Sequence, residues 1–212
     1  MYRLCRILFV LLIARPITLF LLGLNVRHRE KLDWSQPAII VANHNSHLDT
    51  LVLLSLVPLK HIHRVHPAAA ADYFLCKPLR AWFSRNWLGV VGVERERSDK
   101  HPLAECQAAL AKGHSLLLFP EGTRGEPEKM QALKSGIAHL AKQHPQVPII
   151  PIYMFGLGRA LPKGEWMLIP FFCDVFVGDA VYWQANKVAF LSALEAQFKG
   201  LREKLPAAWM KD

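Results

Sequence analysis

Apolar and polar residues alternate in blocks along most of this chain, and the blocks predict strands and helices in turn. Short continuous apolar runs are typical of strands that are covered on both faces of a sheet. Five such runs lie at residues 38–42, 88–93, 115–119, 148–155 and 171–178. Longer segments predict helices at residues 49–57, 102–113, 133–143 and 188–205. Strands that alternate with helices predict an α/β fold, with a mostly parallel or mixed sheet flanked by helices.

The N-terminal residues differ from this pattern because they are almost entirely apolar. Residues 7–24, ILFVLLIARPITLFLLGL, form two apolar stretches separated by Arg15 and Pro16. A single helix over them would be about 27 Å long, close to the ~30 Å of a bilayer core. It would, however, place an arginine and a helix-breaking proline near the midplane, at a cost of several kcal/mol.

A kinked helix or a helical pair in one leaflet avoids this cost, because Arg15 can then reach the lipid headgroups. A spanning helix and a buried core helix are the alternatives. We therefore expect a hydrophobic helical membrane anchor at residues 1–24 and one globular domain at residues 25–212. The protein would lie at the cytoplasmic (inner) membrane, with its active site on the cytoplasmic side. On that side, anionic headgroups would meet Arg3, Arg6, Arg27 and Arg29.

The charge of the chain indicates an anionic partner. A net charge of +9 fits a nucleic acid, an anionic membrane or a phosphorylated substrate. The sequence contains no recognised nucleic-acid-binding motif, and its apolar N-terminus also argues against that class, so we expect no nucleic-acid partner. The four cysteines are widely separated and form no CxxC pair, which suits a reducing compartment and argues against a disulfide framework or a zinc finger.

Three polar loops each follow a predicted strand. NHNSHLD follows residues 38–42, ERERSD follows residues 88–93, and PEGTRGEPEK follows residues 115–119. In open α/β sheets, ligands gather at the carboxyl ends of the strands. Polar side chains that interrupt an apolar run are also costly to bury unless each finds a partner. The shared position of these loops therefore predicts a functional site.

The first loop contains a candidate acid–base pair. His44 and Asp49 are five residues apart, and a loop that turns into a helix can bring the carboxylate to the imidazole. Such a contact fixes the tautomer of the histidine and stabilises its protonated form. His28 and Asp33 have the same spacing without a preceding strand, so we interpret that pair as accidental. We interpret His47 as a structural residue at the rim rather than a base.

The segment HIHRVH presents a second cluster, with His61, His63 and His66. Histidines at positions i and i+2 of a strand share a face and could bind a metal ion. No carboxylate or cysteine close by completes a ligand set, and Arg64 lies among the histidines. We therefore expect no metal site, and we interpret the segment as a basic loop near lipid headgroups.

Four motifs together resemble those of the glycerolipid acyltransferases, a family that includes the bacterial 1-acyl-sn-glycerol-3-phosphate acyltransferases. Asn43-His44 followed by Asp49 resembles the first motif, NHx4D. GVVGVER at 89–95 is similar to the second, FPEGTRG at 119–125 to the third, and VPIIPI at 147–152 to the fourth. All four occur in the order that the family shows.

The resemblance implies transfer of a fatty acyl group from a thioester to a hydroxyl of a lysolipid. The donor would be acyl-CoA or acyl carrier protein, used as a co-substrate, and no cofactor would stay bound. The most favoured acceptor is lysophosphatidic acid, which would give phosphatidic acid. In this interpretation His44 removes the proton of the acceptor hydroxyl while Asp49 holds the ring.

The resemblance also implies residues that bind the substrate phosphate. The arginines of the second and third motifs, Arg95 and Arg124, would contact it, with Lys134 at the start of the next helix as a third cation. The third motif adds Glu121, Gly122 and Thr123 to this set. Within it, Glu121 would orient an arginine or the loop, Gly122 would allow close backbone approach, and Thr123 would donate or cap.

Two alternatives remain from the sequence. The acceptor could be another lysophospholipid or a lyso-ornithine lipid, because related enzymes share much of the pattern. In addition, the sequence of residues 65–89 differs from that of the best-known lysophosphatidate enzymes. The second is a non-catalytic protein that binds membrane phospholipids, which would leave the four ordered motifs unexplained.

Overall fold

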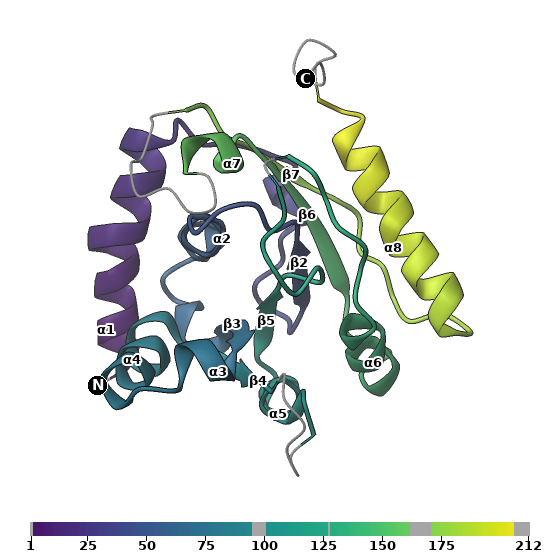
Figure 1. Cartoon of the computed structure of the whole chain (residues 1–212), viewed down its shortest axis with the longest axis horizontal. Coiled ribbons are helices and arrows are strands. Elements are labelled where there is room, and N and C mark those ends of the chain that lie inside the picture. Colours follow the sequence, from purple (N-terminus) through teal and green to yellow (C-terminus); the bar gives the residue numbers. More distant parts are fainter. Residues whose placement is uncertain (1, 95–100, 127, 162–170, 206–212) are drawn as a thin grey trace.

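The structure is a computed structural model, which describes residues 2–94, 101–126, 128–161 and 171–205. These residues form a seven-stranded sheet in the order β1-β7-β6-β2-β5-β3-β4 (Figure 1). The strands are β1 Asn25–Arg27, β2 Ile39–Ala42, β3 Val65–Ala70, β4 Val91–Val93, β5 Ser115–Leu118, β6 Ile149–Phe155 and β7 Asp174–Val177. Neighbours from β6 to β4 run parallel, whereas β7 is antiparallel to β6 and parallel to β1. The predicted mixed α/β sheet is therefore confirmed.

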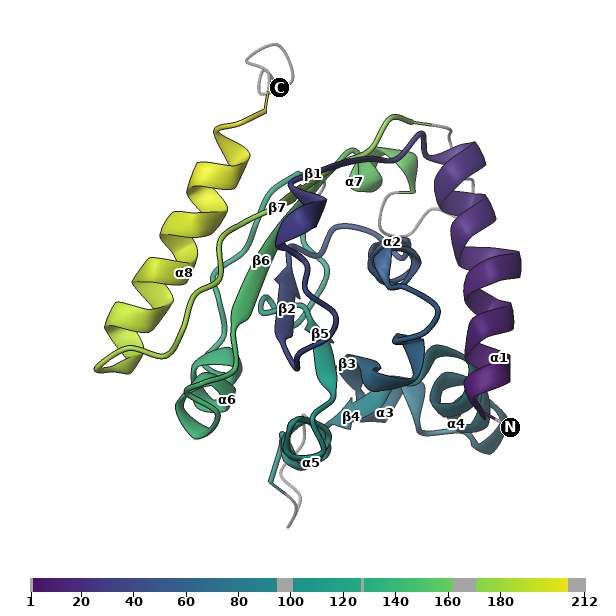
Figure 2. The ribbon, with the colours of Figure 1, turned by 180° about the vertical axis from the view of Figure 1, so that it is seen from behind.

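Helices cover both faces of the sheet (Figures 1 and 2). Side chains alternate along a strand, so Ile40 and Ala42 of β2 face one core while Ile39 and Val41 face the other. The first core is closed by the N-terminal helix and by α2 Asp49–Leu56 and α7 Leu157–Ala160, and the second by α5 Ala104–Ala111, α6 Gly136–Gln143 and α8 Lys187–Arg202. Burial on both faces explains why β2, β5, β6 and β7 are buried at every position.

Two strands were not predicted from the sequence. β1 is a three-residue edge strand, too short to show a pattern. β3 was interpreted as a basic loop, but only the first part of that segment is a turn, a 3-10 helix at Ile62–Arg64, and the strand begins at Val65. Its sequence VHPAAA has one β-branched residue and a proline, and the strand forms because β5 and β4 pair with it on both sides.

The predicted strand at residues 88–93 is shorter in the structure. A π-helical turn at Ser84–Leu88 follows the helices α3 Ala71–Phe74 and α4 Pro78–Phe83. It ends at Gly89, whose φ of +74° reverses the chain before β4 begins at Val91.

The N-terminal segment forms one continuous helix over Tyr2–Leu21, with mean hydropathy 2.2. It comprises α1 Tyr2–Phe9 and two π-helical turns, Val10–Ala14 and Ile17–Leu21. By length and composition it could cross a membrane, although part of it is buried in the protein. Its inner face packs into the first core through Phe9, Val10 and Ala14. Large apolar side chains of its outer face are exposed: Leu4, Leu12, Leu19 and Phe20.

Two arginines of this helix were expected to point outward to lipid headgroups, but both contact the domain instead. Arg15 Nη2 donates to the carbonyl of Val57 at the end of α2, at 3.4 Å. Arg6 is only 4% exposed and donates to the carbonyls of Val65 and Leu88. Contrary to the prediction from the sequence, Arg6 therefore does not point outward from the free face of the helix; the helix turns it inward, toward the pocket between α1, β3 and β4.

Candidate active site

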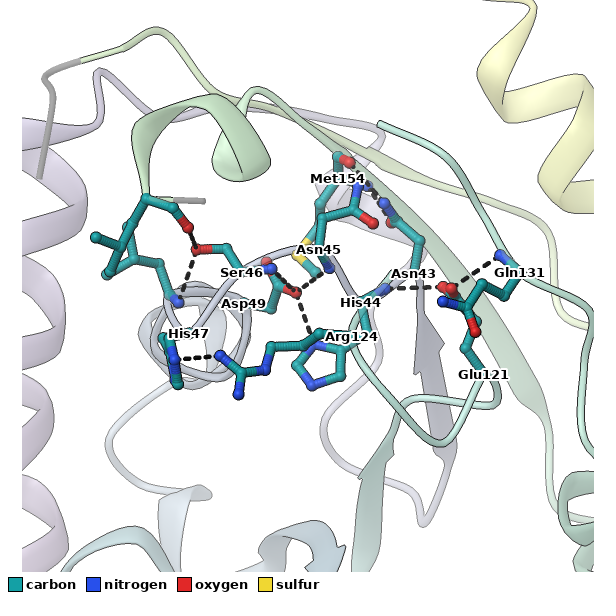
Figure 3. Close-up of polar contacts among 12 residues, drawn as sticks. Asn43, His44, Asn45, Ser46, His47, Asp49, Glu121, Arg124, Gln131 and Met154 are labelled. Atoms are coloured by element: carbon teal, nitrogen blue, oxygen red, sulfur yellow. Dashed lines mark hydrogen bonds and ion pairs between the residues drawn. The ribbon is translucent and has the colours of Figure 1, made fainter. Parts of the chain in front are cut away.

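Two loops meet at the carboxyl end of the adjacent parallel strands β2 and β5 (Figure 3). Asn43 fixes the start of the first loop. Its amide Nδ2 donates to the carbonyl of Met154 at 2.8 Å, and its Oδ1 accepts from the N–H of Met154 at 2.7 Å. The side chain thereby continues the β2–β6 pairing beyond the last backbone pair, Ala42 with Ile152. This anchor sets where the next residue, His44, begins.

The predicted contact between His44 and Asp49 is confirmed. Asp49 is the first residue of α2, and its Oδ2 accepts from His44 Nδ1 at 2.8 Å. The same oxygen accepts from the backbone N–H groups of Asn45 at 2.7 Å and Ser46 at 2.9 Å. The carboxylate is 1% exposed and lies at a helix N-terminus, where the helix dipole favours a negative charge. Three donors therefore hold the Asp49 carboxyl group against the ring.

The imidazole of His44 is also fixed from the second loop. Its ring stacks on Phe119, with centroids 4.0 Å apart and an interplanar angle of 15°. The side chain is 21% exposed, in contrast to buried Asp49. Because Nδ1 binds Asp49, the other ring nitrogen, Nε2, points away from the carboxylate (Figure 3). That geometry leaves Nε2 as the atom that can accept a proton.

Glu121 ties the two loops together. Its Oε1 accepts from the backbone N–H of His44 and its Oε2 from the N–H of Gln131, both at 2.9 Å. The N–H of Gly125 donates to the carbonyl of His44 at 2.9 Å. Glu121 is 1% exposed, and this burial raises its pKa. Its carboxylate therefore faces backbone donors inside the loop, which supports the orienting role within the predicted phosphate set.

Cationic side chains lie near the exposed edge of this loop. Arg124 contacts His47 Nε2 through Nη1 (Figure 3). Partial desolvation of the ring, together with the charge of Arg124, lowers the pKa of His47, so a neutral His47 can accept this hydrogen bond. The structure thus places His47 beside Arg124, whereas the ring nitrogen that bonds Asp49 is that of His44.

Lys134 packs over the same loop from its far end. Its N–H donates to the carbonyl of Pro120 at 2.8 Å, and a Cβ added to Gly122 would lie 2.8 Å from its Nζ. Gly122 has φ of +74°, a backbone conformation that favours glycine. Thr123 is exposed between these groups. Lys134 lies two residues before α6, not at its first turn, because α6 begins at Gly136.

The structure brings together the site residues predicted on the first and third motifs, but it does not describe all of them. Arg95 lies outside the described residues, and its role stays a prediction. The equally spaced pair His28 and Asp33 is confirmed as accidental. His28 contacts Glu30 at 3.4 Å, and Asp33 accepts from the N–H and hydroxyl of Ser35.

The histidines of HIHRVH take other partners. His66 Nδ1 bonds the carbonyl of Gly89 at 2.8 Å, and its Nε2 bonds His114 Nδ1 at 2.9 Å. Within the described part of the chain, no group of three His, Cys, Asp or Glu residues is placed to hold a metal ion.

One residue near the site escaped the sequence reasoning. Glu128 accepts from the N–H of Gly156 at 3.1 Å, which joins the second loop to the end of β6. Its backbone has φ of +59°, and burial raises its pKa to about 7. In the polar segment PEGTRGEPEK, the sequence does not distinguish this buried glutamate from a solvent-exposed one.

Comparisons with known proteins agree with this geometry. Residues 23–155 match the family model described as Acyltransferase. The chain is 34% identical over 146 residues to the 1-acyl-sn-glycerol-3-phosphate acyltransferase LPAT1, chloroplastic, of Arabidopsis thaliana, which covers 67% of this chain and 38% of that protein. It is 31% identical over 135 residues to the lyso-ornithine lipid O-acyltransferase of Rhizobium meliloti (strain 1021), covering 62% of this chain and 44% of that protein. The match therefore spans less than half the length of these relatives.

The fold is similar to a solved structure. The crystal structure of the 1-acyl-sn-glycerophosphate acyltransferase PlsC from Thermotoga maritima superposes with a TM-score of 0.74 at 22% identity. The alignment covers 93% of this chain and 79% of that one. At this level of identity the likeness supports the fold.

Proposed function

This chain belongs to the Acyltransferase family, and from that membership we propose that it transfers a fatty acyl group from a thioester to a hydroxyl of a lysophospholipid. The acceptor is lysophosphatidic acid and the product is phosphatidic acid. The observation that carries the proposal is the contact between His44 Nδ1 and buried Asp49 at 2.8 Å, at the carboxyl end of β2. A histidine held in this way is suited to general-base catalysis.

In the proposed mechanism each proton has a definite position. Asp49 keeps the proton of His44 on Nδ1, so Nε2 accepts the proton of the acceptor hydroxyl as its oxygen attacks the thioester carbonyl carbon. The tetrahedral intermediate then collapses and expels the thiolate, which takes the proton back from Nε2. The acceptor oxygen is the nucleophile, so no acyl-enzyme forms. General-base assistance of this kind contributes about 10²–10⁴-fold.

The second loop supplies the groups that hold the acceptor phosphate. Arg124 offers a planar pair of donors, which suits a phosphate. Gly122 and Thr123 lie beside it, and Lys134 adds a charge over Gly122. Arg95 of the second motif completes the set in this proposal. Glu121 acts through the backbone of His44 and Gln131 and touches neither substrate.

In this proposal the N-terminal helix holds the active site at a lipid surface. We propose that Tyr2–Leu21 lies in one leaflet of the cytoplasmic membrane, with its exposed apolar side chains among the acyl chains. Residues 1–24 then serve as the anchor of the domain at 25–212, and the His44 site faces the cytoplasm. The acyl donor is acyl-CoA or acyl carrier protein.

A lyso-ornithine lipid is the second candidate acceptor, favoured by the similarity to the Rhizobium protein. The two candidates differ in charge chemistry, since only lysophosphatidic acid carries a phosphate monoester for Arg124 to bind. The test uses the purified full chain in neutral detergent, with each donor and with both lysolipids. We expect phosphatidic acid to form at least about tenfold faster than the acylated ornithine lipid. A faster ornithine reaction would assign the second candidate, and no transfer from either donor would refute the proposal.

A further inference from the structure

A pocket of about 620 Å³ lies at the opposite end of the parallel strands from His44. It is bounded by the first turn of α1, the start of β3, the end of α4 and the start of β4. His66 in its wall pairs with Leu116, which in turn pairs with Ile39 at the start of β2. His44 lies beyond the other end of β2, more than about 10 Å farther along the strand direction. The pocket is therefore separate from the proposed active site.

The wall of this pocket is cationic. Arg3, Arg6 and Arg85 line it together with His63 and His66, and no acidic side chain is among its described lining residues. Arg85 has an acidic partner outside the lining, Glu105, at 2.9 Å. A volume of this size is in the range of small-molecule sites. The concentration of positive charge in one concavity favours an anionic ligand.

Arg6 shows that the wall is incomplete without such a ligand. It is 4% exposed, and burial lowers its pKa to about 10, so it remains charged at neutral pH. Its Nη2 donates to the carbonyls of Val65 and Leu88, but Nε has no hydrogen-bond partner among the described residues. A Cβ on Gly89 would collide with the guanidinium, so the backbone is shaped around it. Buried charges are costly unless they are paired, and within the described ranges Arg6 contacts carbonyl oxygens but forms no ion pair.

His63 and His66 are compatible with an anion in the pocket. His63 Nδ1 is also buried and has no partner within the described ranges, so it can donate. His66 is held between the Gly89 carbonyl and His114, and burial together with the charge of Arg6 lowers its pKa to about 4. Arg6 and His63 therefore each bring a buried, unpaired donor to the wall of the pocket.

The rim of the pocket indicates where the anion comes from. Two lining residues, Tyr2 and Trp82, are 58% and 54% exposed. Leu4 and Leu79 extend this apolar surface along α1 and α4, at 61% and 85% exposed. Amphipathic aromatic rings beside arginines are typical of the level of the lipid headgroups. Tyr2 and Leu4 belong to the N-terminal helix, which the proposed function assigns to the membrane.

We propose that this pocket binds the headgroup phosphate of an anionic membrane phospholipid. Arg3, Arg6 and Arg85 contact the phosphate, and Tyr2 and Trp82 lie against the glycerol and the first part of the acyl chains. The site is distinct from the acceptor site, and it would hold a resident lipid against the base of the N-terminal helix.

The test measures binding of dihexanoyl phosphatidylglycerol, below its micellar concentration, to the full chain in neutral detergent by titration calorimetry. We expect one saturable site. Arg3→Gln changes an exposed residue, so folding should be preserved, and it should raise Kd about tenfold. Arg6→Lys tests the buried group in the same way. The matched control is Arg64→Gln, an exposed arginine next to His63 that does not line the pocket, and it should leave Kd unchanged.

Three further results would overturn the proposal. Equal weakening by Arg3→Gln and Arg64→Gln would mean diffuse attraction to a basic surface. Inorganic phosphate that binds as tightly as the lipid would mean a site for the free ion. A large loss of binding in Arg124→Ala would mean that the lipid binds in the acceptor site. That result would refute the second lipid site and leave the proposed acyl transfer untouched. Loss of lipid binding in Trp82→Ala, with retained phosphate binding, would support the position of the chains.

Discussion

The loop at residues 43–49 and the turn at residues 28–33 each carry a histidine five residues before an aspartate, but the structure joins the first pair and separates the second. In the loop, His44 lies just after β2 and Asp49 lies in the first turn of α2, so fixed elements position both residues. In the turn, His28 has φ of +60° and leads into a 3-10 helix at Arg29–Lys31, which sends Asp33 to Ser35.

The difference shows that a five-residue spacing between histidine and aspartate produces a contact only when the flanking elements fix both residues. A buried strand and a helix N-terminus fix two ends of a short loop, and they bring one polar side chain to the other. Backbone donors then complete the site, since Asp49 receives two N–H bonds from the loop itself. In the exposed turn, His28 contacts a solvent-exposed glutamate, Glu30, at 3.4 Å. The variants below change residues of the active-site loops, and most of them are compared with a matched change in the turn at residues 28–33.

The largest effect is expected from the general base. His44→Ala removes the atom that takes the proton, so acyl transfer should fall by about 10²–10⁴-fold. His28→Ala is the matched control, and its activity should stay within about twofold of the parent, because His28 makes one weak surface contact. Initial rates of phosphatidic acid formation, with thermal unfolding to verify the fold, measure both. Activity above a few per cent in His44→Ala would refute the assigned role.

A smaller but severe loss is expected from Asp49→Asn. The amide oxygen can occupy the position of Oδ2 and still accept from His44 and the loop, while the amide nitrogen replaces Oδ1, which is buried without a partner among the described residues. The geometry is kept and the charge is lost, so the protonated ring loses its stabilising partner. We expect kcat to fall about 10–100-fold. Asp33→Asn should leave kcat unchanged, and equal effects of the two would contradict the interpretation of the pairs.

A loss of about tenfold is expected for Arg124→Ala, as a weaker use of the acceptor. The change should raise KM for lysophosphatidic acid more than it lowers kcat, because a phosphate contact is made before the chemical step. Arg124→Lys should restore part of the loss, since lysine supplies the charge without the planar fork. A phosphate-free lysolipid is the control substrate. If both acceptors lose the same factor, Arg124 does not bind the phosphate.

The comparison also marks how far sequence reasoning reaches. The strands at residues 38–42 and 115–119 could be predicted because a strand that is buried on both faces has a continuous apolar sequence. The two loops of the site could then be predicted because each follows the carboxyl end of one of these strands. β3 was missed because its pairing partners, not its own residues, make it a strand. The partners of Arg6 and Arg15 were also missed, because hydropathy reports that a helix is apolar but not which side faces the protein.

Buried groups that act on the backbone were the hardest to predict. Asn43 was recognised as part of a motif, but its two bonds to Met154 depend on β6, more than a hundred residues away in the chain. Glu128 depends in the same way on Gly156. Such roles are set by contacts between distant segments, and local patterns of polar and apolar residues carry no information on them.

No loss of activity is expected at Glu128, where the prediction is a change of stability with pH. Burial raises the pKa of Glu128 from 4.5 in the unfolded chain to about 7 in the fold. The folded state therefore binds the proton more tightly, so the group's contribution to stability is fully present below pH 4.5 and is lost as the pH rises through about 7. Glu128→Gln keeps a carbonyl oxygen for the N–H of Gly156 and cannot ionise. The variant should match the parent near pH 4 and exceed it at pH 8 by up to ~3 kcal/mol, several degrees in Tm. The control variant Glu30→Gln, in the exposed turn, should show no such divergence from the parent. If the stability of Glu128→Gln and that of the parent changed with pH in parallel, the pKa of Glu128 would not be raised in the fold.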